Sequence, residues 1–142
     1  MIAYLDSSAI LRIILGQAHA LEEWRSITQG VASALVEVEC LRTLDRLRLA
    51  EGLSDAEIAV RREAVFRLLE SVEIVELTRP VLARASQPLP TALGTLDAIH
   101  LATALLWKDR SGVDLVMATH DEVLATASRA SGLRVIGISK SF

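Results

Sequence analysis

The stretch that decides the fold is Met1-Ile-Ala-Tyr-Leu-Asp-Ser-Ser-Ala9. Its run from Ile2 to Leu5 is almost wholly apolar, which is typical of a strand covered on both faces, as in a parallel sheet. Asp6 ends the run, and a segment with helical spacing follows. Ligands collect at the carboxyl edge of open α/β sheets. Asp6 therefore has two interpretations: it caps the helix that follows, or it is one of several carboxylates that hold a divalent metal.

The composition of the 142-residue chain predicts one domain, spanning residues 1–142, with a full hydrophobic core. Apolar residues make up 51% of it, while aromatic residues, at 4%, are too scarce for a platform on which bases stack. The net charge of −3 argues against a dominant basic surface, but acidic residues gathered in one site can mask basic ones elsewhere. The single Cys40, with no secretory signal and no apolar stretch long enough to span a membrane, predicts a cytoplasmic protein without a membrane partner.

Strand-like and helix-like segments alternate along the whole chain. Strands are predicted at residues 2–5, 30–33, 72–77, 113–118 and 134–138, and helices at residues 9–15, 19–28, 33–50, 54–70, 78–87, 96–108 and 119–131. Capping boxes are predicted for Ser54 with Glu57 and for Thr119 with Glu122. The alternation predicts an α/β fold with a mainly parallel sheet of about five strands. The helices at 33–50 and 54–70 are predicted to form a hairpin with a solvated, arginine-rich surface.

Four acidic residues are predicted to meet at the carboxyl edge of this sheet. Asp6 and Asp121 follow strands, Asp97 lies in the first turn of the most apolar helix, and Glu39 lies in the second turn of another. Hard cations such as Mg²⁺ and Mn²⁺ bind through a few carboxylates plus waters, and they can activate water for attack on a phosphodiester. Each residue also has a plainer interpretation. Glu39 can pair with Arg42 three residues on, and Asp97 and Asp121 suit helix N-termini.

Four segments of the chain resemble a PIN domain of the VapC type, found in bacterial and archaeal toxin–antitoxin ribonucleases. The resemblance covers the whole chain, with four matching motifs in the right order. They are Tyr4-Leu-Asp-Ser-Ser-Ala9, Ser33-Ala-Leu-Val-Glu-Val-Glu39 followed by Arg42, Leu96-Asp-Ala-Ile-His-Leu-Ala-Thr-Ala104 and Thr119-His-Asp-Glu-Val-Leu124.

The resemblance implies a three-layer α/β/α sandwich with a protruding helical hairpin. It also implies an endoribonuclease that is the toxin of a type II toxin–antitoxin module. The expected RNA substrate is tRNA or rRNA. The implied site residues are the acidic quartet Asp6, Glu39, Asp97 and Asp121, which hold Mg²⁺ or Mn²⁺, and the supporting hydroxyls of Ser8 and Thr119. Asp6 and Asp97 would be the main ligands, and Asp121 the most variable one. A homodimer and a VapB-type antitoxin are the implied partners.

Several assignments stay open from the sequence. Arg42 either contacts phosphate or pairs with Glu39, and His100 is expected to be a packing or hydrogen-bonding residue rather than a catalytic base. A catalytically silent PIN-like module that binds RNA or protein is an alternative to the nuclease. A metal-dependent phosphatase with Asp6 as nucleophile is disfavoured, because Ser8 stands where such enzymes carry a second aspartate.

Overall fold

A computed structural model describes residues 1–17 and 21–138 of the chain. Strands and helices alternate along these residues, as the sequence predicted. The elements are β1 (Ile2–Leu5), α1 (Ser7–Ile14), the short 3-10 helix η1 (Glu22–Ser26), β2 (Gln29–Ser33), α2 (Leu35–Glu51), α3 (Asp55–Glu70), β3 (Val72–Val75), α4 (Arg79–Ala85), α5 (Thr95–Ser111), β4 (Leu115–Ala118), α6 (Glu122–Ala130) and β5 (Arg134–Ile136).

The described strands form one parallel sheet of five strands, in the order β3-β2-β1-β4-β5. β1 is the central strand, and its Ile2 pairs with Gln29 of β2 on one side and with Leu115 of β4 on the other. The chain builds the sheet outward from β1 to β3, then crosses back to β4. The strand order therefore reverses between β1 and β4, and in open α/β sheets ligands bind beyond the carboxyl ends of the two strands at such a switch point.

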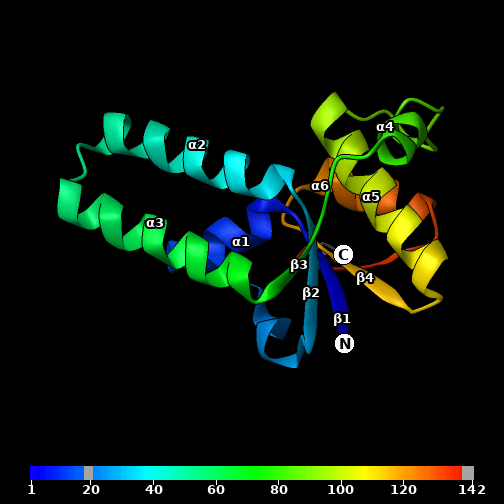
Figure 1. Cartoon of the computed structure of the whole chain (residues 1–142), viewed down its shortest axis with the longest axis horizontal. Helices are drawn as coiled ribbons and strands as arrows, with labels where there is room; N and C mark the ends of the chain where they lie inside the picture. Colours follow the sequence, from blue (N-terminus) through cyan, green and yellow to red (C-terminus); the bar gives the residue numbers. More distant parts are fainter. Residues whose placement is uncertain (18–20, 139–142) are drawn as a thin grey trace.

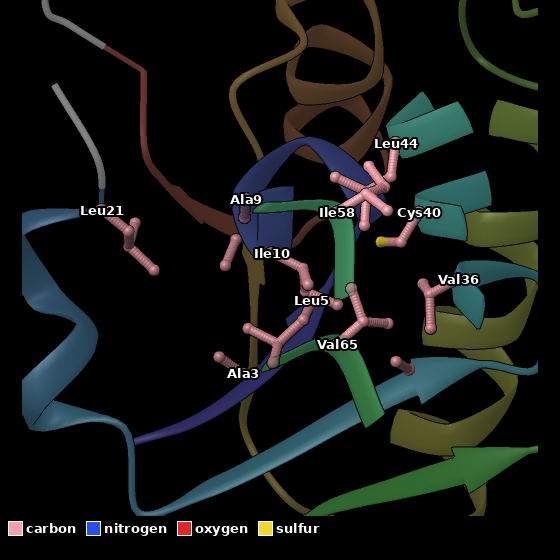
Figure 2. Close-up of a cluster of buried hydrophobic side chains, with 12 residues drawn as sticks. Ala3, Leu5, Ala9, Ile10, Leu21, Val36, Cys40, Leu44, Ile58 and Val65 are labelled. Atoms are coloured by element: carbon pink, nitrogen blue, oxygen red, sulfur yellow. The ribbon is translucent and has the colours of Figure 1, made fainter. Parts of the chain in front are cut away.

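Helices cover both faces of the sheet, with α1, α2 and α3 on one side and α4, α5 and α6 on the other (Figure 1). Successive side chains of β1 point to opposite faces, which is why an unbroken apolar strand feeds two cores. Ala3 and Leu5 join Val36, Cys40 and other residues in the first core (Figure 2). Tyr4 joins the second core with residues of α5, β4 and α6. The predicted three-layer α/β/α sandwich with about five strands is confirmed.

The helices α2 and α3 form a hairpin that projects from the sheet (Figure 1). Gly52 ends α2 in the left-handed conformation, with φ of +63°. Ser54 then caps α3: its hydroxyl accepts from the Glu57 N–H at 3.2 Å, and the Glu57 carboxylate accepts from the Ser54 N–H at 2.8 Å. The hairpin and its capping box are confirmed.

The helix predicted at residues 19–28 is wrong in type. Its first two residues lie outside the described part of the chain, and the rest contains only the 3-10 helix η1. Leu21, Trp24 and Ile27 are three residues apart, and all three pack on the first core. That spacing suits a helix of three residues per turn better than an α-helix. No helix among the described residues is both long and apolar enough to cross a membrane.

Candidate active site

Asp6 lies directly after β1, almost fully buried, and its carboxylate is held by three hydrogen bonds. Oδ1 accepts from the Ser8 hydroxyl at 2.6 Å and from the Ala9 N–H at 3.1 Å, and Oδ2 accepts from the Thr119 hydroxyl at 2.7 Å. Asp6 is thus the N-cap of α1. A carboxylate has about four lone-pair sites, so capping leaves room on Oδ2 for a further ligand. The two interpretations of Asp6 are compatible.

The hydroxyls of Ser8 and Thr119 tie together the segments that follow β1 and β4. Ser8 donates to Asp6 and accepts from the His120 N–H at 2.9 Å. Thr119 donates to Asp6 and accepts from the Asp121 N–H at 3.0 Å. Both side chains therefore orient the Asp6 carboxylate at the switch point of the sheet.

The capping box predicted for Thr119 and Glu122 is wrong. Asp121 is the N-cap of α6, and its Oδ1 accepts from the N–H groups of Val123 at 2.8 Å and Leu124 at 3.1 Å. Thr119 lies two residues before this N-cap, and its hydroxyl donates to the buried carboxylate of Asp6 instead. The second carboxylate oxygen of Asp121 has no donor among the described residues and stays available to a ligand.

Glu39 is held by His100, not by Arg42 as the pairing interpretation supposed. The Oε1 of Glu39 lies 2.6 Å from Nε2 of His100, whereas Arg42 points to Asp45 at 3.4 Å. A buried imidazole in an apolar helix needs polar partners, and the Glu39 side chain of α2 is the partner of His100 on α5. Arg42 is exposed, and its predicted phosphate contact remains a prediction.

Asp97, in the first turn of α5, differs from the other three acidic residues of the site, because its carboxylate lacks a hydrogen-bond donor in the part of the chain that the structure describes. Among the described residues, no donor hydrogen-bonds to its half-buried carboxylate. Burial raises the pKa of Asp97 above the ordinary 3.8, and the charges of Asp121, Asp6 and Glu39 raise it further, while His100 acts in the opposite direction. Burial also raises the pKa of Asp6, although its three hydrogen bonds act the other way.

This mutual repulsion among the acidic residues is what a bound cation would relieve. Within the described ranges, no three His, Cys, Asp or Glu side chains are gathered tightly enough to form a metal cage. Mg²⁺ does not require such a cage, since it keeps several waters and uses one or two carboxylates. The unpartnered carboxylate oxygens of Asp97 and Asp121 are therefore suitable ligands for a hard divalent cation.

A hollow of about 640 Å³ lies between α4, the segment of residues 86–93 and the first turns of α5. Thr95 and Ala98, on either side of Asp97 in the sequence, line it together with the polar side chains of Ser86 and Gln87. Ligand pockets in proteins span roughly 300–1,000 Å³. None of the four acidic residues of the site is among the residues that line it.

Comparison with known proteins identifies the family. The model of the PIN domain matches residues 3–130. The chain is 37% identical to Ribonuclease VapC46 of Mycobacterium tuberculosis, over 96% of this chain and 97% of that protein. Among solved structures, FitAcB from Neisseria gonorrhoeae superposes with a TM-score of 0.69 at 21% identity, covering 95% of this chain and 96% of that one. A toxin–antitoxin complex from Klebsiella pneumoniae superposes with a TM-score of 0.64 at 17% identity, covering 99% of this chain and 98% of that chain. The chain belongs to the PIN domain family and, within it, to the VapC group.

Sequence reasoning missed the partner of Glu39. His100 was expected to pack or to form hydrogen bonds, which is confirmed, but it was not connected with Glu39. Tyr4, whose hydroxyl lies 2.7 Å from Nδ1 of His100, was treated only as part of a strand. A signal was present, because a His and a Tyr within apolar segments must satisfy their polar atoms when buried. The sequence could not say which residues would do so.

Proposed function

We propose that this chain is the toxin of a toxin–antitoxin module, an endoribonuclease that hydrolyses RNA phosphodiester bonds with the help of Mg²⁺ or Mn²⁺. The observation that carries the proposal is the unpartnered carboxylate of Asp97, which shares the switch-point edge of a parallel sheet with Asp6, Glu39 and Asp121. After burial, the charges of the other three carboxylates raise the pKa of Asp97, and a purely structural role gives no reason to gather these charges in one place.

Each residue of the site has a proposed task. Asp97 and Asp6 hold the cation directly, and Glu39 and Asp121 complete or orient its shell. Ser8 and Thr119 keep the Asp6 carboxylate in place by donating hydrogen bonds to it. When bound, a divalent cation can polarise the scissile phosphate and activate water for attack. The buried Cys40 is not a nucleophile here, because burial, with the charges of Glu39 and Asp6, raises its pKa to about 12.

A protein partner is the second part of the proposal. A hollow of about 440 Å³ lies between the base of the hairpin and β3, lined by Phe66, Leu69 and Ile74 with Glu37 and two further glutamates beside them. Phe66 and Ile74 are exposed apolar side chains. An apolar hollow with a polar rim is suited to a side chain of a protein partner. A VapB-type antitoxin is the partner proposed for it, and a homodimer is the second proposed assembly.

The test is to incubate the purified chain, freed of any antitoxin, with total cellular RNA, in Mg²⁺ or Mn²⁺ or in a chelator. We expect discrete cleavage that requires the metal and is abolished in Asp6→Asn, because that change removes the charge with little change in volume. The same variant should relieve growth arrest when the chain is expressed in a bacterial host.

Asp114→Asn is the matched control, since Asp114 is an exposed surface partner of Arg134 and lies outside the candidate site. Circular dichroism should show both variants folded. Metal-dependent cleavage that survives fully in Asp6→Asn would refute the metal-site model. No cleavage by folded, metal-loaded wild type would favour the silent binding module.

A further inference from the structure

A buried imidazole joins three elements that surround the candidate site. His100 of α5 is 1% exposed. Its Nδ1 lies 2.7 Å from the Tyr4 hydroxyl of β1, and its Nε2 lies 2.6 Å from Oε1 of Glu39 on α2. The rings of Tyr4 and His100 meet edge to face, with centroids 5.8 Å apart and planes at 71°. Tyr4 is itself fully buried, so the imidazole is held at both nitrogens and by ring packing.

The ring proton of His100 is placed by its contact with Glu39: an ionised carboxylate only accepts hydrogen bonds, so the bond to Oε1 requires a proton on Nε2. The phenol of Tyr4 keeps its single proton at neutral pH, and it can donate that proton to Nδ1. The proton of a neutral imidazole then resides on Nε2, since a neutral ring has one donor and one acceptor nitrogen. Nε2–H therefore donates to Oε1 of Glu39.

This hydrogen bond restrains a side chain that would otherwise be mobile. Glu39 is partly exposed on α2, where a glutamate has several accessible rotamers. A hydrogen bond from a rigid ring selects one of these rotamers. It engages Oε1 and leaves Oε2 free to face a cation or a metal-bound water, the arrangement by which hydrogen-bonded neighbours orient metal-ligating carboxylates.

We propose that His100, itself fixed by Tyr4, is a positioning residue that holds the Glu39 carboxylate in the orientation needed for the divalent cation. The proposal rests on the function proposed above. It differs from a packing role, in which His100 only fills space between the sheet and α5. A packing role predicts that any side chain of similar volume will serve, whereas positioning requires a hydrogen-bond donor at the place of Nε2.

The test compares two substitutions of similar shape. In His100→Gln the terminal amide can still donate to Glu39, while in His100→Met the side chain is about as long but has no donor. We expect Mn²⁺ affinity, measured by titration calorimetry on folded protein, to fall roughly 10- to 100-fold in His100→Met. His100→Gln should stay much nearer to wild type. Equal affinities for His100→Met and wild type would overturn the proposal, as would equal losses in the two variants.

Ser128→Ala is the control for a general loss of stability. Ser128 is a buried polar residue of α6 whose hydroxyl bonds only the Leu124 carbonyl of its own helix. We expect it to lower the unfolding midpoint without changing Mn²⁺ affinity. A loss of affinity in Ser128→Ala equal to that in His100→Met would mean that destabilisation alone explains the result, and the proposal would fall.

A measurement on wild-type protein keeps the proposal testable if His100→Met does not fold. The nitrogen-15 NMR shifts of the His100 ring should show a proton on Nε2, both without metal and with Mg²⁺. An unprotonated Nε2 would overturn the proposal. Asp6→Asn separates the two levels of inference: if it binds Mn²⁺ and cleaves RNA like wild type, the proposed function fails. If Asp6→Asn is inactive and His100→Met binds Mn²⁺ normally, only the positioning role fails.

Discussion

At the scale of single residues, the acidic side chains of the site serve the fold and the proposed chemistry together. Asp6 caps α1 with one oxygen and bonds Thr119 with the other. Asp121 caps α6 through Oδ1 alone. Capping and metal binding both favour a carboxylate at the point where a strand gives way to a helix. A sequence pattern at such a point therefore cannot separate the two tasks, but substitutions can.

Two substitutions of Asp121 can separate its capping of α6 from metal binding. Asparagine caps helices about as well as aspartate, whereas alanine costs about 1 kcal/mol. We expect Asp121→Ala to lower both the free energy of unfolding and Mn²⁺ affinity. Asp121→Asn should lower Mn²⁺ affinity with a smaller loss of stability, as measured by urea denaturation and calorimetry. Unchanged Mn²⁺ affinity in Asp121→Asn would restrict Asp121 to its capping role.

At the scale of elements, the helical hairpin was predicted correctly, because a few neighbouring residues are enough to end α2 and to begin α3. Gly52 stops α2 with a positive φ, and the reciprocal bonds of Ser54 and Glu57 start α3 within four residues. The 3-10 helix η1 was mistaken for an α-helix, although its apolar residues, three apart, suit a helix of three residues per turn and pack on the first core.

The cap of α3 gives the element-scale prediction. Ser54→Ala should lower the free energy of unfolding by about 1 kcal/mol, because the Glu57 N–H loses its acceptor. RNA cleavage should not change, since the tip of the hairpin lies far from the sheet (Figure 1). Ser54→Asp keeps a capping acceptor and should stay near wild type in the same urea titration. Equal stability of the alanine variant and wild type would show that α3 is held by packing alone.

At the scale of the whole molecule, the site depends on contacts between segments far apart in the sequence. Thr119 reaches Asp6 across 113 positions, and His100 reaches Glu39 across 61. Gly137, directly after β5, also lies against the backbone of Thr119. Gly137 has φ of +99°, and a Cβ there would clash with the carbonyl oxygen of Thr119.

Gly137→Ala should therefore disturb both stability and the site. We expect a loss of roughly 2 kcal/mol or more in the free energy of unfolding, since the clash adds to the strain of a positive φ. Mn²⁺ affinity should fall as well, because the hydroxyl of Thr119 holds Asp6. The control is Gly132→Ala, where φ is +89° but a Cβ meets nothing within 4 Å. If the two variants lose equal stability and neither loses Mn²⁺ affinity, the contact with Thr119 is unimportant.

The sequence by itself determined the class of fold, the order of its elements and the family. Apolar runs and helical spacing are local patterns, and a strand that is apolar at every position can only be covered on both faces. The same patterns placed Asp6, Asp97 and Asp121 near helix starts at one edge of the sheet. Their task as metal ligands remains a prediction from the family resemblance.

Only the tertiary structure decided which of these side chains have partners. Glu39 had Arg42 within reach on its own helix, yet it bonds His100, because burying an imidazole without a partner costs more than leaving a surface arginine in water. Thr119 likewise bonds the buried Asp6 and leaves the capping of α6 to Asp121. Burial sets the cost of an unsatisfied polar group, and burial is known only once the layers are packed together.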